Sequence, residues 1–467
     1  MKRVIVSICV LLVSLSVFAG KPKYVFYFIG DGMGTNQVLM TEYYLAALKG
    51  EMGISPLCFT LFPVATVATH HSANRNVTDS AASGSALATG VKTNNGVISL
   101  DVEGNPVKTL AETARDAGKE IAVVTTSKAN DATPAAFFAH QQDRNWGYEI
   151  MLDMIAHGYE FYGGSALRHE DRDKDNQPVP PIRPQFEAAG YTICNLEGFR
   201  AGYKGMDKVL MIPLEGQAVT YSIDTVNDLP ENRNAHLTFS DFVESALTFL
   251  MRDNPKKGFF MMAEAGEIDH ACHSNDAATV IQEIIDFDEG VRIAYDFYLK
   301  HPKETLIIIA ADHETGGLTI SPRTPETFVP LRVQKHSMNR LSDMLKNRMV
   351  TEKSILSWDE IKAFLKKELG LWDQVQVSWD DEKMLRDIYE ATIAKRDPGS
   401  AKDLYADNSK IVSAAVGVLN RACRINWGSG SHTAGYVPLF AIGPGSELFT
   451  HRTDNAEIAR LIRQAAF

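Results

Sequence analysis

The sequence of 467 residues predicts an α/β protein whose largely parallel central sheet is flanked by helices on both faces. Three observations support this fold class. Short apolar runs rich in β-branched and aromatic residues recur along the chain, helical spans lie between them, and each run leads into a carboxylate or a histidine. Strands that alternate with helices form parallel sheets through right-handed crossovers, and ligands of such sheets bind beyond the carboxyl ends of the strands.

The first unit begins with the apolar residues 24–29 (YVFYFI), which predict a strand. A glycine-rich turn, GDGMG, follows and contains Asp31, and residues 35–48 then show a helical pattern. The turn lacks the glycine spacing of a dinucleotide-binding loop and has a carboxylate where a pyrophosphate would lie. We therefore expect Asp31 to be a metal ligand at the end of this strand.

The stretch from Val77 to Gly90 reads VTDSAASGSALATG, in which Asp79-Ser80 precedes small, helix-tolerant residues. Ser80 can open a helix whose free backbone N–H groups bind an anion. An ordinary helix cap is the alternative interpretation. A serine hydroxyl is a weak nucleophile until a base or a metal ion removes its proton, and the nearest histidines in the sequence are His70 and His71. We expect the activator of Ser80 to come from elsewhere in the chain.

The same pattern recurs three times, because residues 119–126, 258–263 and 305–311 also predict strands. The polar residues after them are, in order, Asp131 to Pro134, Glu264 with Asp269 to His273, and Asp312-His313-Glu314. We expect a helix after Pro134 that carries His140 and Arg144. Because parallel strands end at the same rim of a sheet, these side chains are predicted to lie near Asp31.

The regular alternation lapses after Gly317. Residues 322–425 are rich in charge and show helical patterns near residues 351–369, 381–395 and 408–421, which predict a helical insertion that caps the sheet rim. A glycine-rich loop with His432, a strand at residues 436–442 and a helix at residues 455–466 follow. We therefore divide the chain into a signal peptide (1–19), a catalytic α/β domain in two parts (20–321 and 426–467) and the helical cap (322–425).

The charge and the first residues bear on partners and location. A net charge of −11 without long basic runs argues against a nucleic-acid-binding surface, and an acidic protein that binds anions needs local positive charge, which divalent metals supply. Lys2 and Arg3, the apolar residues 4–17 and small residues before Ala19 predict a signal peptide cleaved after Ala19, and hence a periplasmic or secreted protein. We expect no membrane span in the mature chain.

The cysteines that follow the predicted signal peptide are Cys58, Cys194, Cys272 and Cys423. Their wide, irregular spacing predicts neither a disulfide framework nor a thiolate zinc site, and the sequence does not distinguish their possible pairings.

Two pairs of residues have the spacing of metal ligands. Asp269 and His273, four residues apart, share one face of a helical turn, and Asp312 and His313 are adjacent at a strand end. Carboxylate with imidazole suits Zn²⁺, whereas carboxylate with hydroxyl and water suits Mg²⁺. Each pair alone is equally consistent with a surface turn or a helix cap. Because such groups follow successive strands, we interpret them as metal ligands.

These motifs together resemble the alkaline phosphatases with three metals and a serine nucleophile. The resemblance covers nearly the whole chain after the signal peptide, and it rests on GDGMG, TDSAAS, DATPAA, EAGEIDHACH, ADHETGG and SHTAG in that order. It implies two zinc ions, one magnesium ion and an alkaline-phosphatase-like fold. It also implies small phosphomonoester substrates, inorganic phosphate as product, and a homodimer.

The resemblance also implies a role for each site residue. The catalytic residues would be Ser80, which forms a phosphoserine, and Arg144, which binds phosphate. The first zinc would be bound by Asp269, His273 and His432, the second by Asp31, Asp312, His313 and Ser80, and magnesium by Asp31, Asp131, Thr133 and Glu264. His270 would lie behind the ligands, and either contact phosphate through water or support Asp131. For His140 and Glu314 we expect structural roles.

Three alternatives differ from this interpretation. A sulfatase of the same superfamily would need an arginine in its activation motif, which TDSAAS lacks. A phosphodiesterase shares the two-zinc centre, but Asp131, Thr133 and Glu264 favour the monoesterase. A non-enzymatic phosphate-binding protein would have no use for a serine nucleophile beside three metal sites. The physiological substrate is not encoded in these motifs.

Overall fold

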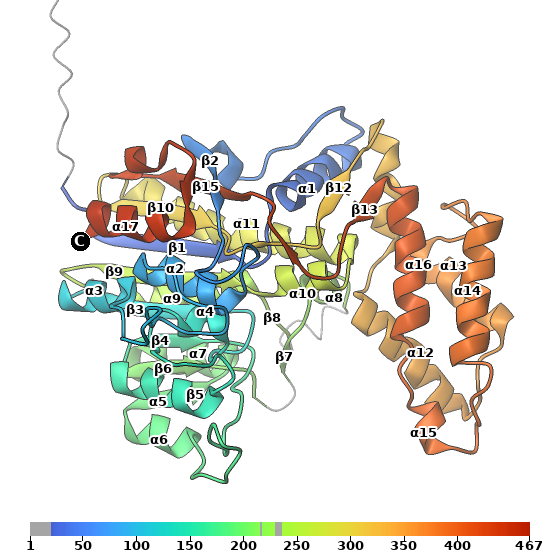
Figure 1. Cartoon of the computed structure of the whole chain (residues 1–467), viewed down its shortest axis with the longest axis horizontal. Helices are drawn as coiled ribbons and strands as arrows, with labels where there is room; N and C mark the ends of the chain where they lie inside the picture. The colour runs from blue at the N-terminus through green and yellow to red at the C-terminus, as the bar shows by residue number, and fades with distance from the viewer. Residues whose placement is uncertain (1–19, 215–216, 229–235) are drawn as a thin grey trace, which may run out of the picture.

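The computed structural model describes residues 20–214, 217–228 and 236–467, so the predicted signal peptide lies outside the described residues. A 10-stranded sheet forms the centre of the molecule (Figure 1). Its strands lie in the order β16 (Thr453–Asp454), β2 (Val64–Thr69), β15 (Val437–Ile442), β10 (Thr305–Ala310), β1 (Tyr24–Gly30), β9 (Phe259–Ala265), β3 (Glu120–Thr125), β4 (Phe161–Gly163), β6 (Lys208–Met211) and β5 (Tyr191–Cys194).

The strands from β10 to β5 in this order pair in parallel, which confirms the predicted α/β class. All residues of β1 and β10 are buried, as expected for strands that are covered on both faces. Strand β15 differs, because it is antiparallel to both β10 and β2. An apolar run predicts a strand without specifying its direction, so the sequence alone does not reveal this reversal.

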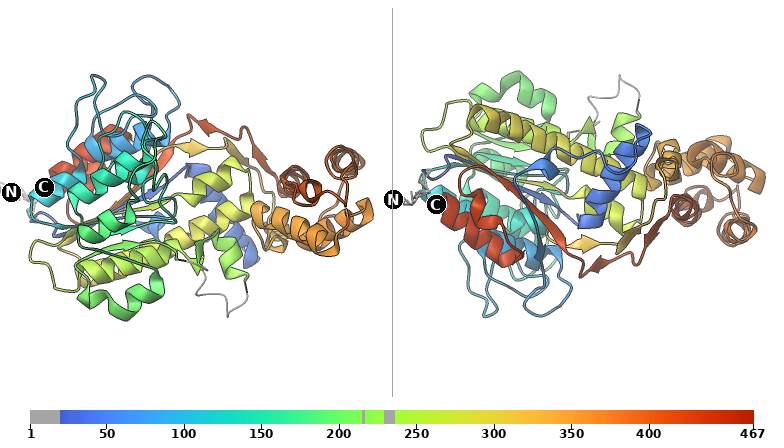
Figure 2. Two further views of the ribbon diagram at one scale, coloured as in Figure 1. Left: turned by 90° about the horizontal axis from the view of Figure 1, so that it is seen from below. Right: turned by 90° about the horizontal axis from the view of Figure 1, so that it is seen from above.

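Helices cover both faces of the sheet, as Figure 2 shows. One face is covered by α9 (Phe239–Leu250) and α11 (Ala277–Lys300), and the other by α2 (Ser80–Thr89), α3 (Leu110–Asp116), α4 (Ala132–Ala135) and α17 (Asn455–Ala466). The remaining helices of this part are α1 (Thr35–Leu48), α5 (Gly147–His157), α6 (Arg183–Ala188), α7 (Leu196–Gly202), α8 (Ser222–Val226) and α10 (Glu267–His273).

The predicted helix that carries His140 and Arg144 is wrong. Helix α4 ends at Ala135, and both residues lie beyond it in an irregular segment. This segment pairs with the loop after α2, because Gln141 exchanges backbone hydrogen bonds with Ile98 and the Arg144 N–H donates to the Gly96 carbonyl at 2.8 Å. Tertiary pairing therefore replaces the helical hydrogen bonds here.

The insertion forms a group of helices beyond one end of the sheet in all views (Figures 1 and 2). Its helices are α12 (Met338–Glu352), α13 (Trp358–Leu369), α14 (Trp379–Thr392), α15 (Ala401–Leu404) and α16 (Ser409–Ala422). Two short antiparallel ribbons connect them to the sheet, formed by β12 (Leu318–Ile320) with β13 (Ile425–Trp427) and β11 (Glu314–Thr315) with β14 (His432–Thr433). A two-stranded parallel sheet, β7 (Ala218–Val219) with β8 (His236–Leu237), lies apart.

Candidate metal centre and nucleophile

Four neighbouring strands end at one rim of the sheet and carry polar side chains there. The strands are β10, β1, β9 and β3, which are adjacent in this order. Asp312 follows β10, Asp31 follows β1, Glu264 lies near the end of β9, and Thr125 ends β3. The prediction that these strand ends meet is confirmed. The ribbon of β11 with β14 also places His432 opposite Thr315, which is two residues after His313.

A first cluster consists of Asp269, His273 and His432, whose ligand atoms lie within 4.8 Å of one another. Nδ1 of His273 lies 2.7 Å from the Gly430 carbonyl, and Nδ1 of His432 lies 2.9 Å from the Thr78 carbonyl. A carbonyl only accepts, so each ring carries a proton on Nδ1. The Nε2 atoms of the two rings face each other at 3.2 Å, and that of His273 also lies 3.1 Å from Oδ2 of Asp269, an arrangement that a shared cation would stabilise.

A second cluster consists of Asp31, Asp312 and His313. The Thr315 hydroxyl donates to Oδ1 of Asp269, so it accepts from Nδ1 of His313 at 3.2 Å. Nε2 of His313 is thereby left without a proton, although Oδ1 of Asp31 and Oδ2 of Asp312 lie 3.4 and 3.1 Å from it. Two carboxylate oxygens around an imidazole lone pair repel it unless a cation lies between them.

Ser80 lies beside the second cluster, with Oγ 3.2 Å from Nε2 of His313. It is the first residue of α2, as the sequence predicts, because the Asp79 side chain accepts from the Ala82 N–H and caps the helix. Gly84, one turn later, allows α2 to pack closely on α4, since a Cβ there would lie 3.1 Å from Cα of Thr133. Backbone and packing together fix the hydroxyl at the rim.

A third group consists of Glu264, Asp131 and Thr133, and Glu264 also interacts with Asp31. Thr133 and Glu264 are almost completely buried, and Thr125 donates a hydrogen bond to Glu264. Burial raises the pKa of Glu264, and the charge of Asp131 adds to this effect. Asp131 caps α4, as its side chain accepts from the Ala132 N–H at 2.8 Å. Two carboxylates and a hydroxyl are a suitable ligand set for Mg²⁺.

The electrostatics of the rim favour cations. Burial, and then the charges of Asp312 and Asp269, raise the pKa of Asp31 well above its ordinary value. Burial also raises the pKa of Asp312 and lowers that of His313 well below the usual histidine value. Burial disfavours charge on Asp269 as well, but the hydrogen bond with His273 and the neighbouring histidines hold its pKa below the ordinary value. Several buried carboxyl groups this close together ionise readily only when positive ions are bound.

Arg144 lies between two carboxylates at this rim. Its guanidinium is 3.4 Å from Oδ2 of Asp79 and 3.3 Å from Oδ1 of Asp131. Arg168, which the sequence analysis missed, has Nη1 3.9 Å from Oδ1 of Asp131, and it donates a hydrogen bond to the Arg144 carbonyl. The Asn130 side chain fixes Arg168 by accepting from its N–H and donating to its carbonyl, both at 2.9 Å.

Burial opposes ionisation of Asp131, but the charges of Arg144 and Arg168, and to a lesser degree that of His270, hold its pKa below the ordinary value. The hydrogen bond between His270 and Glu267 raises the pKa of His270 to about 9. Glu314 is structural, because it accepts hydrogen bonds from the Gln37 side chain and from the N–H groups of Gly317 and Leu318. Cysteines 58, 194, 272 and 423 are buried and unpaired.

Sequence reasoning missed three supporting residues. Thr315 lies inside the ADHETGG motif, and its position there is the sequence signal that could have identified it. Thr125 ends a predicted strand, and a polar residue there is a weaker signal. Arg168 lies in an irregular segment without a motif, and only the tertiary structure places it beside Asp131.

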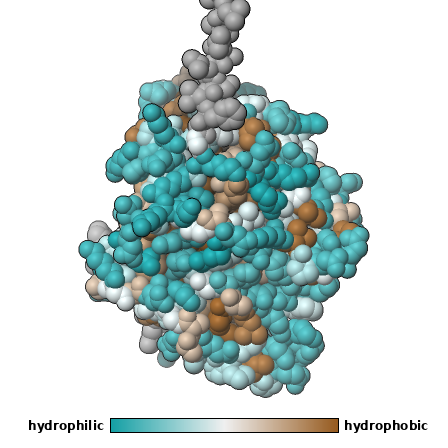
Figure 3. Space-filling model, turned by 90° about the vertical axis from the view of Figure 1, so that its left-hand side faces the viewer, coloured by the Kyte–Doolittle hydropathy of each residue, from teal (hydrophilic) through white to brown (hydrophobic). Residues whose placement is uncertain are grey.

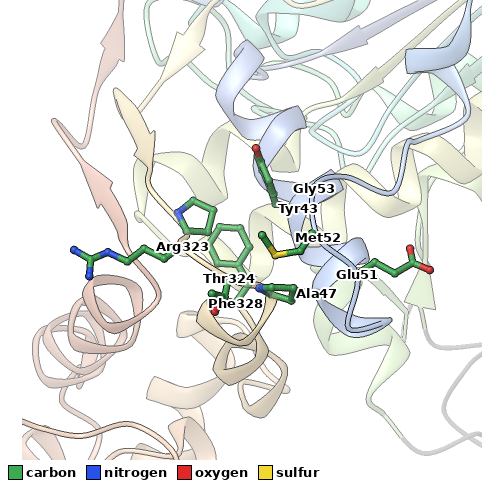
Figure 4. Close-up of a pocket in the computed structure, with 10 residues that line it drawn as sticks. Tyr43, Ala47, Glu51, Met52, Gly53, Arg323, Thr324 and Phe328 are labelled. Carbon is green, nitrogen blue, oxygen red and sulfur yellow. The ribbon is translucent and has the colours of Figure 1, made fainter.

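A separate cavity of about 270 Å³ lies at the end of α1, away from these clusters. Figure 4 shows Tyr43, Met52 and Phe328 around it, whereas the charged ends of Glu51 and Arg323 extend away from each other. Because its walls hold no group of metal ligands or nucleophile among the described residues, we assign no chemistry to it.

Comparisons with known proteins all point to one family. The family model described as alkaline phosphatase matches residues 22–165 and 218–467. Alkaline phosphatase 3 of Bacillus subtilis is 28% identical over 453 residues, covering 95% of this chain and 88% of that protein. Alkaline phosphatase H of Pseudomonas aeruginosa is 31% identical over 348 residues, covering 65% of this chain and 72% of that protein. The crystal structure of a cold-active alkaline phosphatase from a psychrophilic Shewanella sp. has the same fold, with a TM-score of 0.76 and 24% identity. The match covers 95% of this chain and 100% of that chain.

Proposed function

Because this chain belongs to the alkaline phosphatase family and is thereby a phosphoric monoester hydrolase, we propose that it hydrolyses small phosphate monoesters through a phosphoserine on Ser80. The observation that carries this proposal is the convergence of three Nε2 atoms, those of His273, His432 and His313, on buried carboxyl groups near the Ser80 hydroxyl. This arrangement suits positive ions, and the Ser80 hydroxyl lies beside the ligands that would bind them.

The ligand sets support two zinc ions and one magnesium ion. Asp269, His273 and His432 would bind the first zinc, and Asp31, Asp312, His313 and Ser80 would bind the second. Asp31, Asp131, Thr133 and Glu264 would bind magnesium. A structure of a variant of the alkaline phosphatase from the Antarctic bacterium TAB5 is described with Mg bound in its M3 site. The bound ions would supply the positive charge that lowers the pKa of the serine and of water and stabilises the leaving oxygen.

The residues of the chain would divide the reaction between them. Ser80 loses its proton and attacks phosphorus, and the bond from phosphorus to the substrate oxygen breaks to release the alcohol. Arg144 binds two non-bridging oxygens with its planar guanidinium, assisted by the N–H groups that begin α2. Asp79 and Asp131 hold that guanidinium in place. Water then cleaves the phosphoserine, which releases inorganic phosphate and restores Ser80.

Turnover of a monoester compared with a diester tests this function. Metal-loaded protein is expected to hydrolyse p-nitrophenyl phosphate much faster than bis(p-nitrophenyl) phosphate. Prolonged chelation should abolish this activity, and zinc with magnesium should restore it. A preference for the diester would instead make the protein a phosphodiesterase, and full activity in protein shown by elemental analysis to be free of metal would reject the metal-dependent mechanism.

Export and assembly are also proposed. No described helix is both long and apolar enough to cross a bilayer. We propose a periplasmic or secreted protein that begins at Gly20 after cleavage, which intact mass spectrometry of the protein from its host would test. We also propose a homodimer. Light scattering tests it, because the measured molar mass should be twice that of the mature chain.

A further inference from the structure

A second group of potential ligands lies outside the catalytic centre. Glu112 in α3, His140 after α4 and His157 at the end of α5 each contribute one ligand atom, and these atoms all lie within 4.8 Å of one another. We call these three residues the Glu112 cluster. They line a cavity of about 450 Å³ together with Lys108 and Arg115, among others.

The Glu112 cluster lies at the opposite rim of the sheet from Ser80. Helix α3 precedes β3 and helix α5 precedes β4, so Glu112 and His157 lie toward the amino ends of these strands. The catalytic side chains follow the carboxyl ends, and the six residues of β3 span about 20 Å. This end of the molecule, the left side of Figure 1, is largely hydrophilic at its surface (Figure 3).

Hydrogen bonds orient the ligand atoms of the cluster. Nδ1 of His140 lies 2.9 Å from the Ser99 carbonyl and carries a proton, so Nε2 is the ring nitrogen that faces Oε1 of Glu112, at 3.3 Å. The other carboxylate oxygen, Oε2, accepts from the Thr109 N–H at 2.7 Å and caps α3. Oε1 therefore faces both histidines, with Nε2 of His140 at 3.3 Å and Nε2 of His157 at 4.0 Å.

The basic side chains around the cavity are paired with acidic residues outside the Glu112 cluster. Arg115 makes a two-pronged ion pair with Glu160 at 2.7 and 2.9 Å, and Lys108 pairs with Asp116. His157 is the last residue of α5, where the helix dipole favours positive charge. A protonated His140 paired with Glu112 is the simplest rival, but it leaves the approach of His157 to the same oxygen unexplained.

We propose that Glu112, His140 and His157 bind a Zn²⁺ ion that is distinct from the catalytic metals. Two imidazoles with one carboxylate are a common zinc ligand set, and water from the cavity would complete a tetrahedron. Tetrahedral zinc places its ligand atoms about 3.3 Å apart. Oε1 of Glu112 and Nε2 of His140 already have this spacing, whereas Nε2 of His157 is 4.0 Å from Oε1 and would have to move closer by a small rotation of its side chain.

Such an ion would join three separate segments of the chain. It would connect α3 and α5 with the irregular segment that begins at His140 and leads to Arg144. Gln141 in this segment is already paired with Ile98, and Arg144 with Gly96. The ion would therefore anchor the base of the segment that positions Arg144.

Zinc content and anomalous scattering test the site in the metal-loaded protein. Glu112→Gln retains an oxygen for the α3 cap but loses the anionic ligand, His157→Gln removes an imidazole, and the exposed His451 provides the control His451→Gln. We expect each of the first two variants to contain one zinc ion per chain fewer than the wild type. The control should contain as much zinc as the wild type. Anomalous zinc peaks that remain at the Asp269 and Asp31 clusters of both variants would show that the lost ion is distinct from the catalytic metals.

Crystals of the wild type should show an anomalous zinc peak bounded by Glu112, His140 and His157. Wild-type zinc content in both variants, or no peak at this cluster while the Asp269 cluster is loaded, would overturn the proposal in favour of the ion pair of His140 with Glu112.

Discussion

At the scale of single residues, the side chains around Ser80 are oriented by groups that do not take part in chemistry. Carbonyls of Thr78 and Gly430 fix the protonated nitrogens of His432 and His273, and the Thr315 hydroxyl does the same for His313. The Nε2 nitrogens therefore point to one another and to carboxylates. The ligand identities are readable from motifs, whereas these orienting contacts depend on segments that are distant in sequence.

Ser80→Ala removes the proposed nucleophile without removing the charged ligands. We expect turnover of p-nitrophenyl phosphate to fall by on the order of 10³-fold, with residual activity from metal-bound water and Arg144. Elemental analysis should show nearly unchanged metal content, because the ligands other than Ser80 remain. Wild-type turnover in Ser80→Ala would show that Ser80 is not the nucleophile.

The two arginines are expected to differ in their effect on phosphate binding. Arg144→Ala should raise the inhibition constant of inorganic phosphate about 10- to 100-fold, the effect of losing a charge-assisted hydrogen bond. Arg168→Ala should have a smaller effect in the same direction, because Arg168 supports Arg144 through its carbonyl. The exposed Arg172 provides the control Arg172→Ala. An equal or larger effect of Arg168→Ala would mean that Arg168 itself contacts phosphate.

At the scale of elements, the adjacency of β10, β1, β9 and β3 is what concentrates the ligands. Apolar runs followed by polar residues predicted these strands and their shared rim, because the signal is local and strong. Strands β4, β5 and β6 were not predicted, since runs of three or four residues carry little periodicity. The antiparallel direction of β15 and the early end of α4 depend on tertiary pairing, which a single sequence does not display.

Lys119, just before β3, joins the beginnings of three strands. Its ammonium donates to the carbonyls of Pro22, Lys23 and Lys257 at 3.0, 2.7 and 3.2 Å. Burial, and then the charges of Lys23 and Lys257, lower the pKa of Lys119 to about 8. An unfolded lysine has a pKa of about 10.4, so between these values the unfolded chain binds more protons and the free energy of unfolding rises with pH.

Lys119→Met should therefore destabilise the protein, by about 1–3 kcal/mol from the unpaired carbonyls. The deficit relative to wild type should be larger at pH 10 than at pH 7.5, because the stabilisation from Lys119 is complete only above the unfolded pKa and is lost as pH falls through the folded pKa. Chemical denaturation of both proteins at fixed metal concentration measures this difference. A deficit that shrinks with rising pH would contradict the assignment.

At the scale of the whole molecule, the helical insertion borders the catalytic rim. A cleft of about 730 Å³ lies between them, and His273, a proposed zinc ligand, shares its wall with Met338, Ile388 and Ala391 of the insertion. The sequence of residues 322–425 predicted helices that cap the sheet rim, but it did not predict which of their side chains face the catalytic site. Because the leaving group of a substrate bound beside His273 would extend toward this cleft, we propose that the insertion limits substrate size.

Ala391→Trp in α14 tests this role without removing the insertion. The added indole should lower kcat/KM for a bulky naphthyl phosphate about tenfold, as a steric conflict in a binding pocket does, and leave glycerol phosphate nearly unaffected. The matched control is Ala394→Trp, also exposed but outside the cleft wall. Equal effects on both substrates, or the same selectivity change in the control, would show that the cleft does not bind the leaving group.

The most direct test of the central claim is the metal-dependent appearance of phosphate on Ser80. Metal-loaded protein is mixed with a phosphomonoester, quenched with acid, and digested for mass spectrometry of the peptide that contains residues 77–90. The account predicts phosphate on Ser80 in the loaded protein and none in chelated protein that elemental analysis shows to be metal-free. Phosphate on another residue of the loaded protein, or equal phosphorylation of Ser80 without metal, would contradict it.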